Sequence, residues 1–167
     1  MITMEVDLLD RVQERFEETL DKMTTEEANK MPYPLLKSVT WLFWHTAREL
    51  DMQISDLKDE DSMYKSDGWN DRFDLPLPDD TPEYKHTPEE ARQITVTDKA
   101  LLSDYLDASI KLAKDYLDNL NEDTIDEIVD ENWTPPVTHR ARLVSIIDDA
   151  VMHSGQAVYT RRLVIGE

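Results

Sequence analysis

The chain of 167 residues contains no cysteine. Disulfide bonds, a thiolate nucleophile supplied by the protein and metal sites ligated by cysteine are therefore excluded. Glycine occurs only three times, so tight turns that depend on glycine must be few. Leucine, alanine, glutamate and lysine are frequent, and these residues favour helix. The composition therefore predicts a largely helical protein.

Long apolar runs and a basic N-terminus are also lacking. No stretch approaches the roughly 18 consecutive apolar residues that a membrane-spanning helix requires. The N-terminal sequence MITMEVDLLD is acidic, whereas a secretory signal peptide begins with basic residues followed by an apolar run. We therefore expect no membrane partner and a cytoplasmic location.

Positive charge is scarce. The chain has 18 Lys and Arg residues against 37 Asp and Glu residues, and its formal net charge is −19. Proteins that bind the nucleic-acid backbone neutralise phosphates with Lys and Arg, so no nucleic-acid partner is expected. Acidic, solvated surfaces are common, and the charge alone does not indicate DNA mimicry.

Four segments carry the periodicity of long amphipathic helices. In the first, apolar residues keep the helical period from Met4 to Leu20. The second covers residues 38–57, with Ser38 as a plausible N-cap. It is apolar nearly all round at its start, which indicates a helix in the middle of a bundle.

The third segment opens at Thr87, which is the expected N-cap, with a proline at the first helical position and a glutamate at the third. Its apolar period continues to Leu120, with one irregularity in the β-branched sequence ITVT (94–97). Pro135 and Pro136 end the acidic run that follows, and Thr138 is the expected N-cap of the last helix.

The connections differ in length. Thr24 and Glu27 predict a short helical turn after the first helix. Residues 57–87 have no sustained periodicity, and such a long connection is more often functional or lid-like than idle. Residues 121–132 form a connector or a short helix. These features together predict an all-α fold, an up-down four-helix bundle with a long crossover loop, in a single domain over residues 1–167.

Only four histidines occur. His86 lies in the long connection, and His139 lies in the first turn of the last helix. We expect both to be exposed at the surface. His45 and His153 instead lie within helices, on or beside faces directed to the core. A lone histidine in that setting is usually a hydrogen-bonded core residue, and that alternative stays open here.

A carboxylate precedes His153 by one helical turn. Asp149 and His153 are four residues apart, which places two ligands on one helix face about 6 Å apart. Together with His45 they form a His₂Asp set that leaves room for water or substrate, as catalytic divalent metals require. Gln156 and Arg48 would then support the ligands or orient the substrate.

Several nearby residues have two possible roles. Trp44 could border a substrate, although aromatic residues at helical spacing, Trp41 included, usually fill a core. Arg48 and Asp51 could form an ion pair on the helix surface. Arg161 and Arg162 could neutralise the carboxyl end of the last helix or bind an anionic substrate, and we favour the first.

Three stretches carry a resemblance to a family. WLFWHTARELD (41–51), GWNDRFDLP (68–76) and RLVSIIDDAVMHSGQAVYTRRLV (142–164) resemble the DinB-like superfamily of bacterial four-helix proteins. The likeness is to the branch with W-H-x-x-R-x-x-D in the second helix and H-x-G-Q in the last. It extends over essentially the whole chain, including TEEANKMPYP (25–34).

This resemblance implies a down-up-up-down bundle with a metal between the helices. Typical members use one histidine of the second helix, matched by His45, and an H-x-x-x-H-x-G-Q pair, whose last histidine is matched by His153. Asp149 replaces the middle histidine. An oxygen ligand shifts the preference among Zn²⁺, Ni²⁺ and Mn²⁺ slightly toward harder ions, unless Asp149 only holds an imidazole.

The resemblance also implies a range of activities. Characterised relatives include transferases and isomerases that use low-molecular-weight bacterial thiols, so a metal-dependent thiol S-transferase with a small-molecule substrate is one expectation. A metal-dependent hydrolase is another. A non-enzymatic, stress-linked binding protein is the third, because function depends on the site rather than the fold. A homodimer is compatible with each of them.

Overall fold

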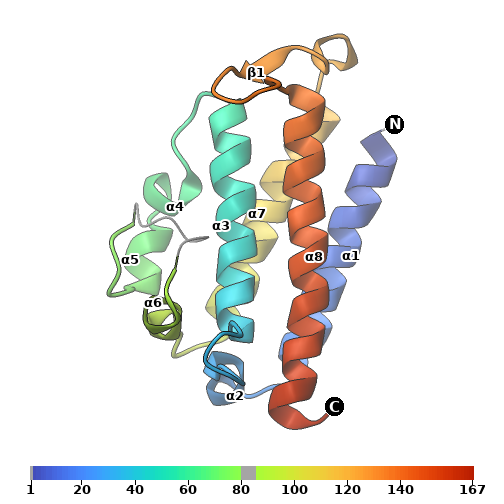
Figure 1. Ribbon diagram of the computed structural model, residues 1–167. Coiled ribbons are helices and arrows are strands. Elements are labelled where there is room, and N and C mark those ends of the chain that lie inside the picture. Colours follow the sequence, from blue (N-terminus) through green and yellow to red (C-terminus); the bar gives the residue numbers. More distant parts are fainter. Residues whose placement is uncertain (1, 80–85) are drawn as a thin grey trace.

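Four long helices form the body of the protein in the computed structural model, which describes residues 2–79 and 86–167. They are α1 (Ile2–Asp21), α3 (Val39–Leu57), α7 (Ala100–Asp118) and α8 (His139–Ile165). α1 and α8 run in one direction, and α3 and α7 run in the other (Figure 1). The all-α bundle and its down-up-up-down order are therefore confirmed.

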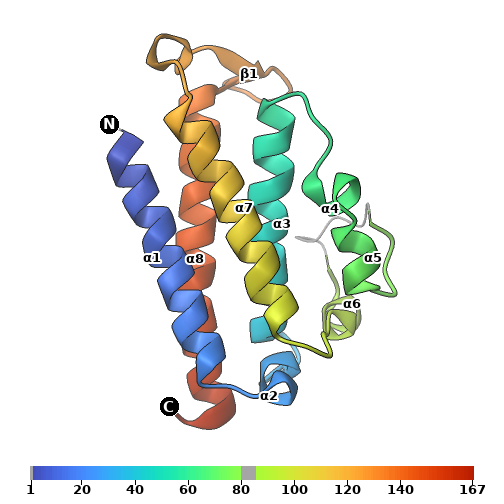
Figure 2. The ribbon, with the colours of Figure 1, turned by 180° about the vertical axis from the view of Figure 1, so that it is seen from behind.

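The core lies where the apolar faces of these four helices meet. α3 packs between α7 and α8, and α1 covers the other side of the same pair, as Figure 2 shows from behind. Phe16 of α1 and Phe43 of α3 are fully buried, with ring centroids 4.6 Å apart. Each such side chain contributes about 1.5–3 kcal/mol through burial. No helix among the described residues is long and apolar enough to cross a membrane.

The predicted helix starts are confirmed at Thr24, Ser38, Thr87 and Thr138. Thr24 and Glu27 form a reciprocal capping box for the short helix α2 (Thr25–Asn29). The hydroxyl of Ser38 accepts a hydrogen bond from the backbone N–H of Trp41 at the start of α3. Thr138 caps α8 in the same way. Each cap satisfies a backbone donor that the first helical turn leaves unpaired.

The connection between α3 and α7 contains short helices rather than only irregular chain. These are α4 (Met63–Ser66), α5 (Trp69–Phe73) and α6 (Pro88–Gln93). They lie beside α3 and return the chain to the end at which α3 begins (Figure 1). α7 therefore runs parallel to α3, as a crossover connection requires.

The irregularity predicted at ITVT (94–97) is a complete break, so the prediction that one helix continues from Thr87 to Leu120 is wrong. α6 ends at Gln93 and α7 begins only at Ala100. The side chain of Asn29 bonds both backbone groups of Val96, at 2.8 Å to its oxygen and 3.1 Å from its nitrogen. Ile94 and Val96 are buried while the residues beside them are exposed. The β-branched stretch is thus held extended by a residue far away in the sequence.

Asp51 joins three elements. Its carboxylate accepts hydrogen bonds from the backbone N–H groups of Met63 and Tyr64 at the start of α4 and from the hydroxyl of Tyr105 on α7, each at 2.8 Å. Asp51 is fully buried and Arg48 is 3% exposed. The prediction that these two residues form an ion pair on the helix surface is therefore wrong.

The segment before α8 includes a small hairpin that the sequence did not indicate. A 3₁₀ turn (Glu122–Thr124) precedes β1 (Ile128–Asp130), which pairs antiparallel with β2 (Val137–Thr138). Ile128 lies opposite Thr138. Strands this short are below the length at which alternation can be read from a sequence.

Candidate metal centre

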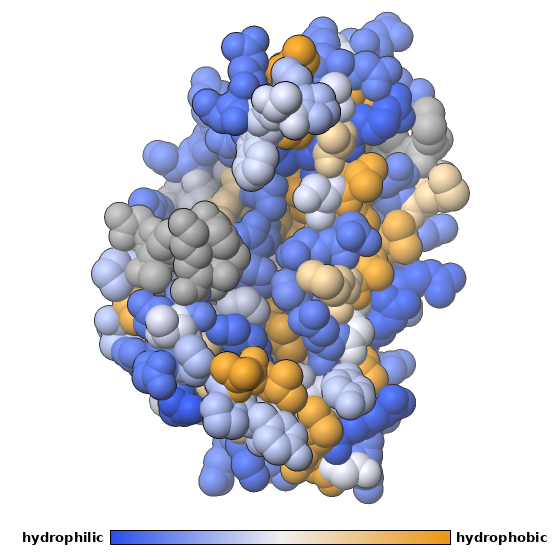
Figure 3. Space-filling view, in the orientation of Figure 1, coloured by the Kyte–Doolittle hydropathy of each residue, from blue (hydrophilic) through white to orange (hydrophobic). Residues whose placement is uncertain are grey.

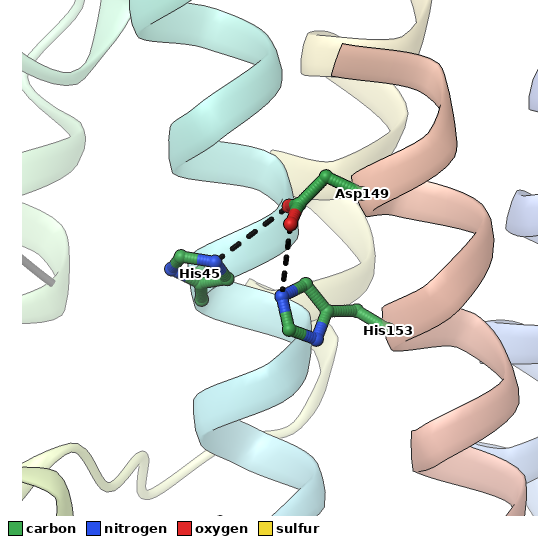
Figure 4. A group of neighbouring side chains, drawn as sticks. All are labelled: His45, Asp149 and His153. Carbon is green, nitrogen blue, oxygen red and sulfur yellow. Dashed lines mark ion pairs between the residues drawn. The ribbon is translucent and has the colours of Figure 1, made fainter. Parts of the chain in front are cut away.

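His45 of α3 faces Asp149 and His153 of α8 across the interface of the two helices (Figure 4). Nε2 of His45 lies 3.7 Å from Oδ2 of Asp149, and Nε2 of His153 lies 3.4 Å from Oδ1. The two imidazole centroids are 4.7 Å apart, with their planes nearly perpendicular at 87°. The three side chains predicted from the sequence therefore converge on one point.

The donor set suits a divalent metal ion. One ligand atom from each residue lies within 4.8 Å of the other two. Three ligands that each lie about 2.1 Å from one ion in tetrahedral geometry are about 3.4 Å apart, so the donor atoms need to close by about 1.4 Å at most. Oδ2 of Asp149 is buried and accepts no hydrogen bond from the residues that the structure describes. A buried carboxylate oxygen without a donor is costly, and a cation would satisfy it.

Trp41 positions both imidazole rings. Its indole stacks on His45, with centroids 4.4 Å apart and planes within 12°. Its edge packs against His153 at 6.2 Å. His45 is 4% exposed and His153 is 9% exposed. The rings are thus held by packing before any ligand arrives.

Gln156 orients His153 from the next turn of α8. Its Oε1 lies 2.7 Å from Nδ1 of His153 and accepts a hydrogen bond from it. When Nε2, which faces Asp149, loses its proton as metal binding requires, the bond to Gln156 keeps the remaining proton at Nδ1. Metal-binding histidines are commonly fixed in this way by an acceptor at the other ring nitrogen.

Charge couples Asp149 to the histidines. Burial lowers the pKa of His153, but the hydrogen bond and charge of Asp149, together with Gln156, raise that pKa above its ordinary value. Burial raises the pKa of Asp149, but His153 and then His45 lower it below its ordinary value. In the metal-free protein the pair therefore favours a protonated His153 imidazole beside an ionised Asp149 carboxylate.

Arg48 and Trp44 face the connection between α3 and α7. The Arg48 guanidinium lies 3.9 Å from the Tyr64 ring centroid and donates to the backbone oxygen of Asp79 at 3.0 Å. Trp44 stacks on His86 at 6.0 Å. That either residue binds substrate stays a prediction. The expected cover by residues 57–87 falls partly on residues 80–85, which lie outside the described part of the chain.

The prediction that His86 is exposed is wrong. His86 is 8% exposed, and its Nδ1 accepts a hydrogen bond from the indole N–H of Trp41 at 3.0 Å. A buried indole N–H requires a hydrogen-bond acceptor. The presence of Trp41 in a core-facing helix is therefore the one sequence feature that could have indicated a buried acceptor such as His86. His139 is half-buried and hydrogen-bonded to the hydroxyl of Tyr116, so it too is not a free surface residue.

Residues 8–157 match the sequence profile of the DinB superfamily. The chain belongs to the DinB superfamily. A solved structure described as a conserved protein of locus from Enterococcus faecalis is 60% identical to it, with a TM-score of 0.97 over 100% of this chain and 98% of that one. No curated protein shows significant similarity to the chain.

Arg161 has a structural role at the end of α8 in this DinB superfamily protein. It is buried, and its Nε donates to the backbone oxygen of Glu167 at 2.9 Å. The contact agrees with the favoured reading, in which a cation near the carboxyl end of the last helix offsets the helix dipole.

Proposed function

We propose that this protein binds one divalent metal ion through Nε2 of His45, the carboxylate of Asp149 and Nε2 of His153. The observation that carries the proposal is the approach of these three donors to within 4.8 Å. Zn²⁺, Ni²⁺ and Mn²⁺ accept such a nitrogen and oxygen set, and the single carboxylate favours harder ions more than a third imidazole would.

We further propose that the bound metal activates a low-molecular-weight thiol for transfer to a small-molecule electrophile. A metal held by these three residues would keep a position for such a group and would lower the pKa of the thiol, which would supply a thiolate nucleophile at neutral pH. The nucleophile must come from outside, because the chain has no cysteine. Membership of the DinB superfamily supports this choice.

The chain's own residues would prepare the site for that reaction. The Asp149 side chain is 33% exposed, so the centre opens to solvent on the side of this carboxylate. Trp41 covers the face of His45 and limits access of water from the core side. Gln156 keeps the Nδ1 proton of His153 in place, so Nε2 stays available as a donor atom.

Metal analysis tests the first proposal. Protein made without a histidine tag is stripped, reconstituted separately with Zn²⁺, Ni²⁺ and Mn²⁺, and its bound metal is measured by mass spectrometry. We expect one ion per wild-type chain, little in His45→Ala or His153→Ala, and an unchanged ratio in the control His139→Ala. No stoichiometric metal in the wild type, or equal loading of His153→Ala, would overturn the proposal.

Asp149→His tests whether the carboxylate is a ligand. We expect this variant to gain affinity for Ni²⁺ and Zn²⁺ relative to Mn²⁺, because a nitrogen replaces an oxygen. Asp149→Ala should lose affinity for all three ions. Equal affinities of Asp149→Ala and the wild type would show that Asp149 only holds an imidazole.

Conjugation of a fluorogenic electrophile by the loaded protein tests the reaction. Bacillithiol, mycothiol and glutathione are supplied in turn, and we expect metal-dependent turnover with at least one of them that His153→Ala abolishes. Stoichiometric metal without turnover would overturn the transferase and leave a metal-binding protein.

A further inference from the structure

A groove lies next to the candidate metal centre, between the segment before α3 and the last turns of α8. Its volume is about 540 Å³, within the range of sites that hold small organic molecules. Leu42 forms part of its α3 side, and Met152, Gly155 and Gln156 form part of its α8 side.

The lining is apolar and partly exposed. Leu35 is 82% exposed and Tyr159 is 62% exposed, and Leu36 and Met152 are exposed beside them. Figure 3 shows apolar side chains gathered on the lower part of this face, and further apolar side chains higher on the same face. Apolar patches of this kind on an acidic protein mark places where an apolar group binds.

Lys37 is the one charged side chain among the described residues that line the groove. None of the described residues that line it carries a carboxylate, although the chain has 37 acidic residues. The Lys37 ammonium donates to the backbone oxygen of His86 at 3.1 Å and lies 4.8 Å from the Trp41 ring centroid. An ammonium has three donors, so Lys37 can serve a further acceptor. Burial lowers the pKa of Lys37 below its ordinary value, although the negative charge of Glu90 raises it in part. A bound anion would offset the free-energy cost of burying the ammonium.

Both sides of the groove contact the candidate centre. Gln156 lines the groove and also holds Nδ1 of His153 at 2.7 Å. Lys37 lies over Trp41, whose ring stacks on His45. A molecule in the groove would therefore lie beside groups that fix both histidines.

We propose that this groove binds a small amphipathic anion, with its apolar body against Leu35, Met152 and Tyr159 and its carboxylate at Lys37. The identification of this molecule as the substrate rests on the proposed function of the metal centre. The binding of the molecule to the groove is independent of that function. An anion is favoured over a second copy of the chain, because Lys37 offers a positive charge that no carboxylate among the described lining residues neutralises.

Binding of octanoate, octanamide and octylamine to the metal-free protein, followed by calorimetry, tests the charge requirement. The three probes share an apolar chain and differ in the charge of the head. We expect octanoate to bind most tightly and octylamine least. Lys37→Met should weaken octanoate binding about tenfold and leave octanamide within about twofold. Equal binding of octylamine and octanoate, or no octanoate binding, would overturn the proposal.

Gly155→Leu tests the location. An added Cβ at Gly155 meets no atom within 4 Å, and leucine favours helix more than glycine does, so the variant should fold and fill the groove. We expect it to abolish octanoate binding, whereas the matched Gly155→Ala keeps it. Unchanged binding by Gly155→Leu would overturn the location. A wild-type dimer that Gly155→Leu converts to a monomer, seen by light scattering, would assign the groove to a second copy and overturn the proposal.

Metal loading of the same proteins separates this inference from the proposed function. Lys37→Met and Gly155→Leu should each load metal as the wild type does. Wild-type protein that loads metal without binding octanoate overturns the groove alone. Wild-type protein that binds octanoate without loading metal overturns the metal centre alone.

Discussion

Asp149 and His153 lie one turn apart on α8, with Oδ1 of the carboxylate 3.4 Å from Nε2 of the imidazole. This nitrogen is the atom that we propose as a metal ligand. A proton and a metal ion therefore compete for it, and the carboxylate that favours the metal also favours the proton. The pH dependence of the site follows from this competition.

Metal affinity should fall as the pH is lowered. His153 must be neutral to bind a metal, and its pKa is raised by Asp149, which outweighs the effect of burial. Loss of affinity should therefore begin above the ordinary histidine pKa of about 6.5. Titration of the metal-free protein with Zn²⁺ between about pH 5.5 and about pH 8 checks this. An affinity independent of pH over that range would contradict the role of His153.

Asp149→Asn should destabilise the metal-free protein over a limited pH window. The raised pKa of His153 contributes stability that is present below about pH 6.5 and is lost as the pH rises through the raised value. The lowered pKa of Asp149 contributes stability that is present above about pH 3.9 and is lost as the pH falls through the lowered value. Both contributions are present between these limits.

In that window the variant should lose about 1 kcal/mol, a small amount because the Asp149 side chain is 33% exposed and solvent screens the pair. Urea unfolding at several pH values measures the difference. Asp148→Asn, at an exposed neighbour on the same helix, is the matched control. A loss that grows steadily with rising pH would refute the assignment.

Gln156→Ala should weaken metal binding without removing a ligand. Loss of the acceptor at Nδ1 frees the tautomer and orientation of His153, and comparable supporting residues are worth about 10–100-fold in metal affinity. Gln156→Glu keeps an acceptor and should retain more of the affinity. Competition with a chelator of known affinity measures both variants. If Gln156→Ala binds metal as tightly as the wild type, the hydrogen bond has no supporting role.

Asp51→Ala should cost about 3 kcal/mol of folding free energy or more. The change leaves the backbone N–H groups of Met63 and Tyr64 and the hydroxyl of Tyr105 without their acceptor. Asp56→Ala on the same helix removes an exposed carboxylate that pairs with Arg142 and should cost about 0.5 kcal/mol. Chemical unfolding of the metal-free variants compares the two. Equal losses would contradict the role of Asp51 in holding α4 and α7.

The sequence predicted best where the cause of a structure is local. Thr24, Ser38 and Thr138 each cap the helix expected of them, because a cap depends on residues within a single turn. The spacing of Asp149 and His153 predicted that both lie on one face of α8 for the same reason. The position of His45 on a core-facing stripe and the family resemblance together predict that His45 belongs to the same ligand set.

The errors have causes that lie far away in the sequence. The break before α7 depends on Asn29, 67 residues from Val96. The burial of His86 depends on Trp41, 45 residues away. No pattern within a window of the chain reports such contacts, so the apolar period from Thr87 to Leu120 predicts one helix with an irregularity at ITVT rather than two separate helices.

The amino-acid sequence alone determined the presence of long amphipathic helices, the caps of α3 and α8, the absence of cysteine chemistry and the one-turn spacing of Asp149 and His153. Tertiary structure decided that His45 meets these two residues, that Asp51 binds α4 and α7 to α3, and that Lys37 lies in an otherwise uncharged groove. The physical reason is that periodicity and capping act within a few residues. The positions of side chains across the bundle depend instead on how whole helices pack.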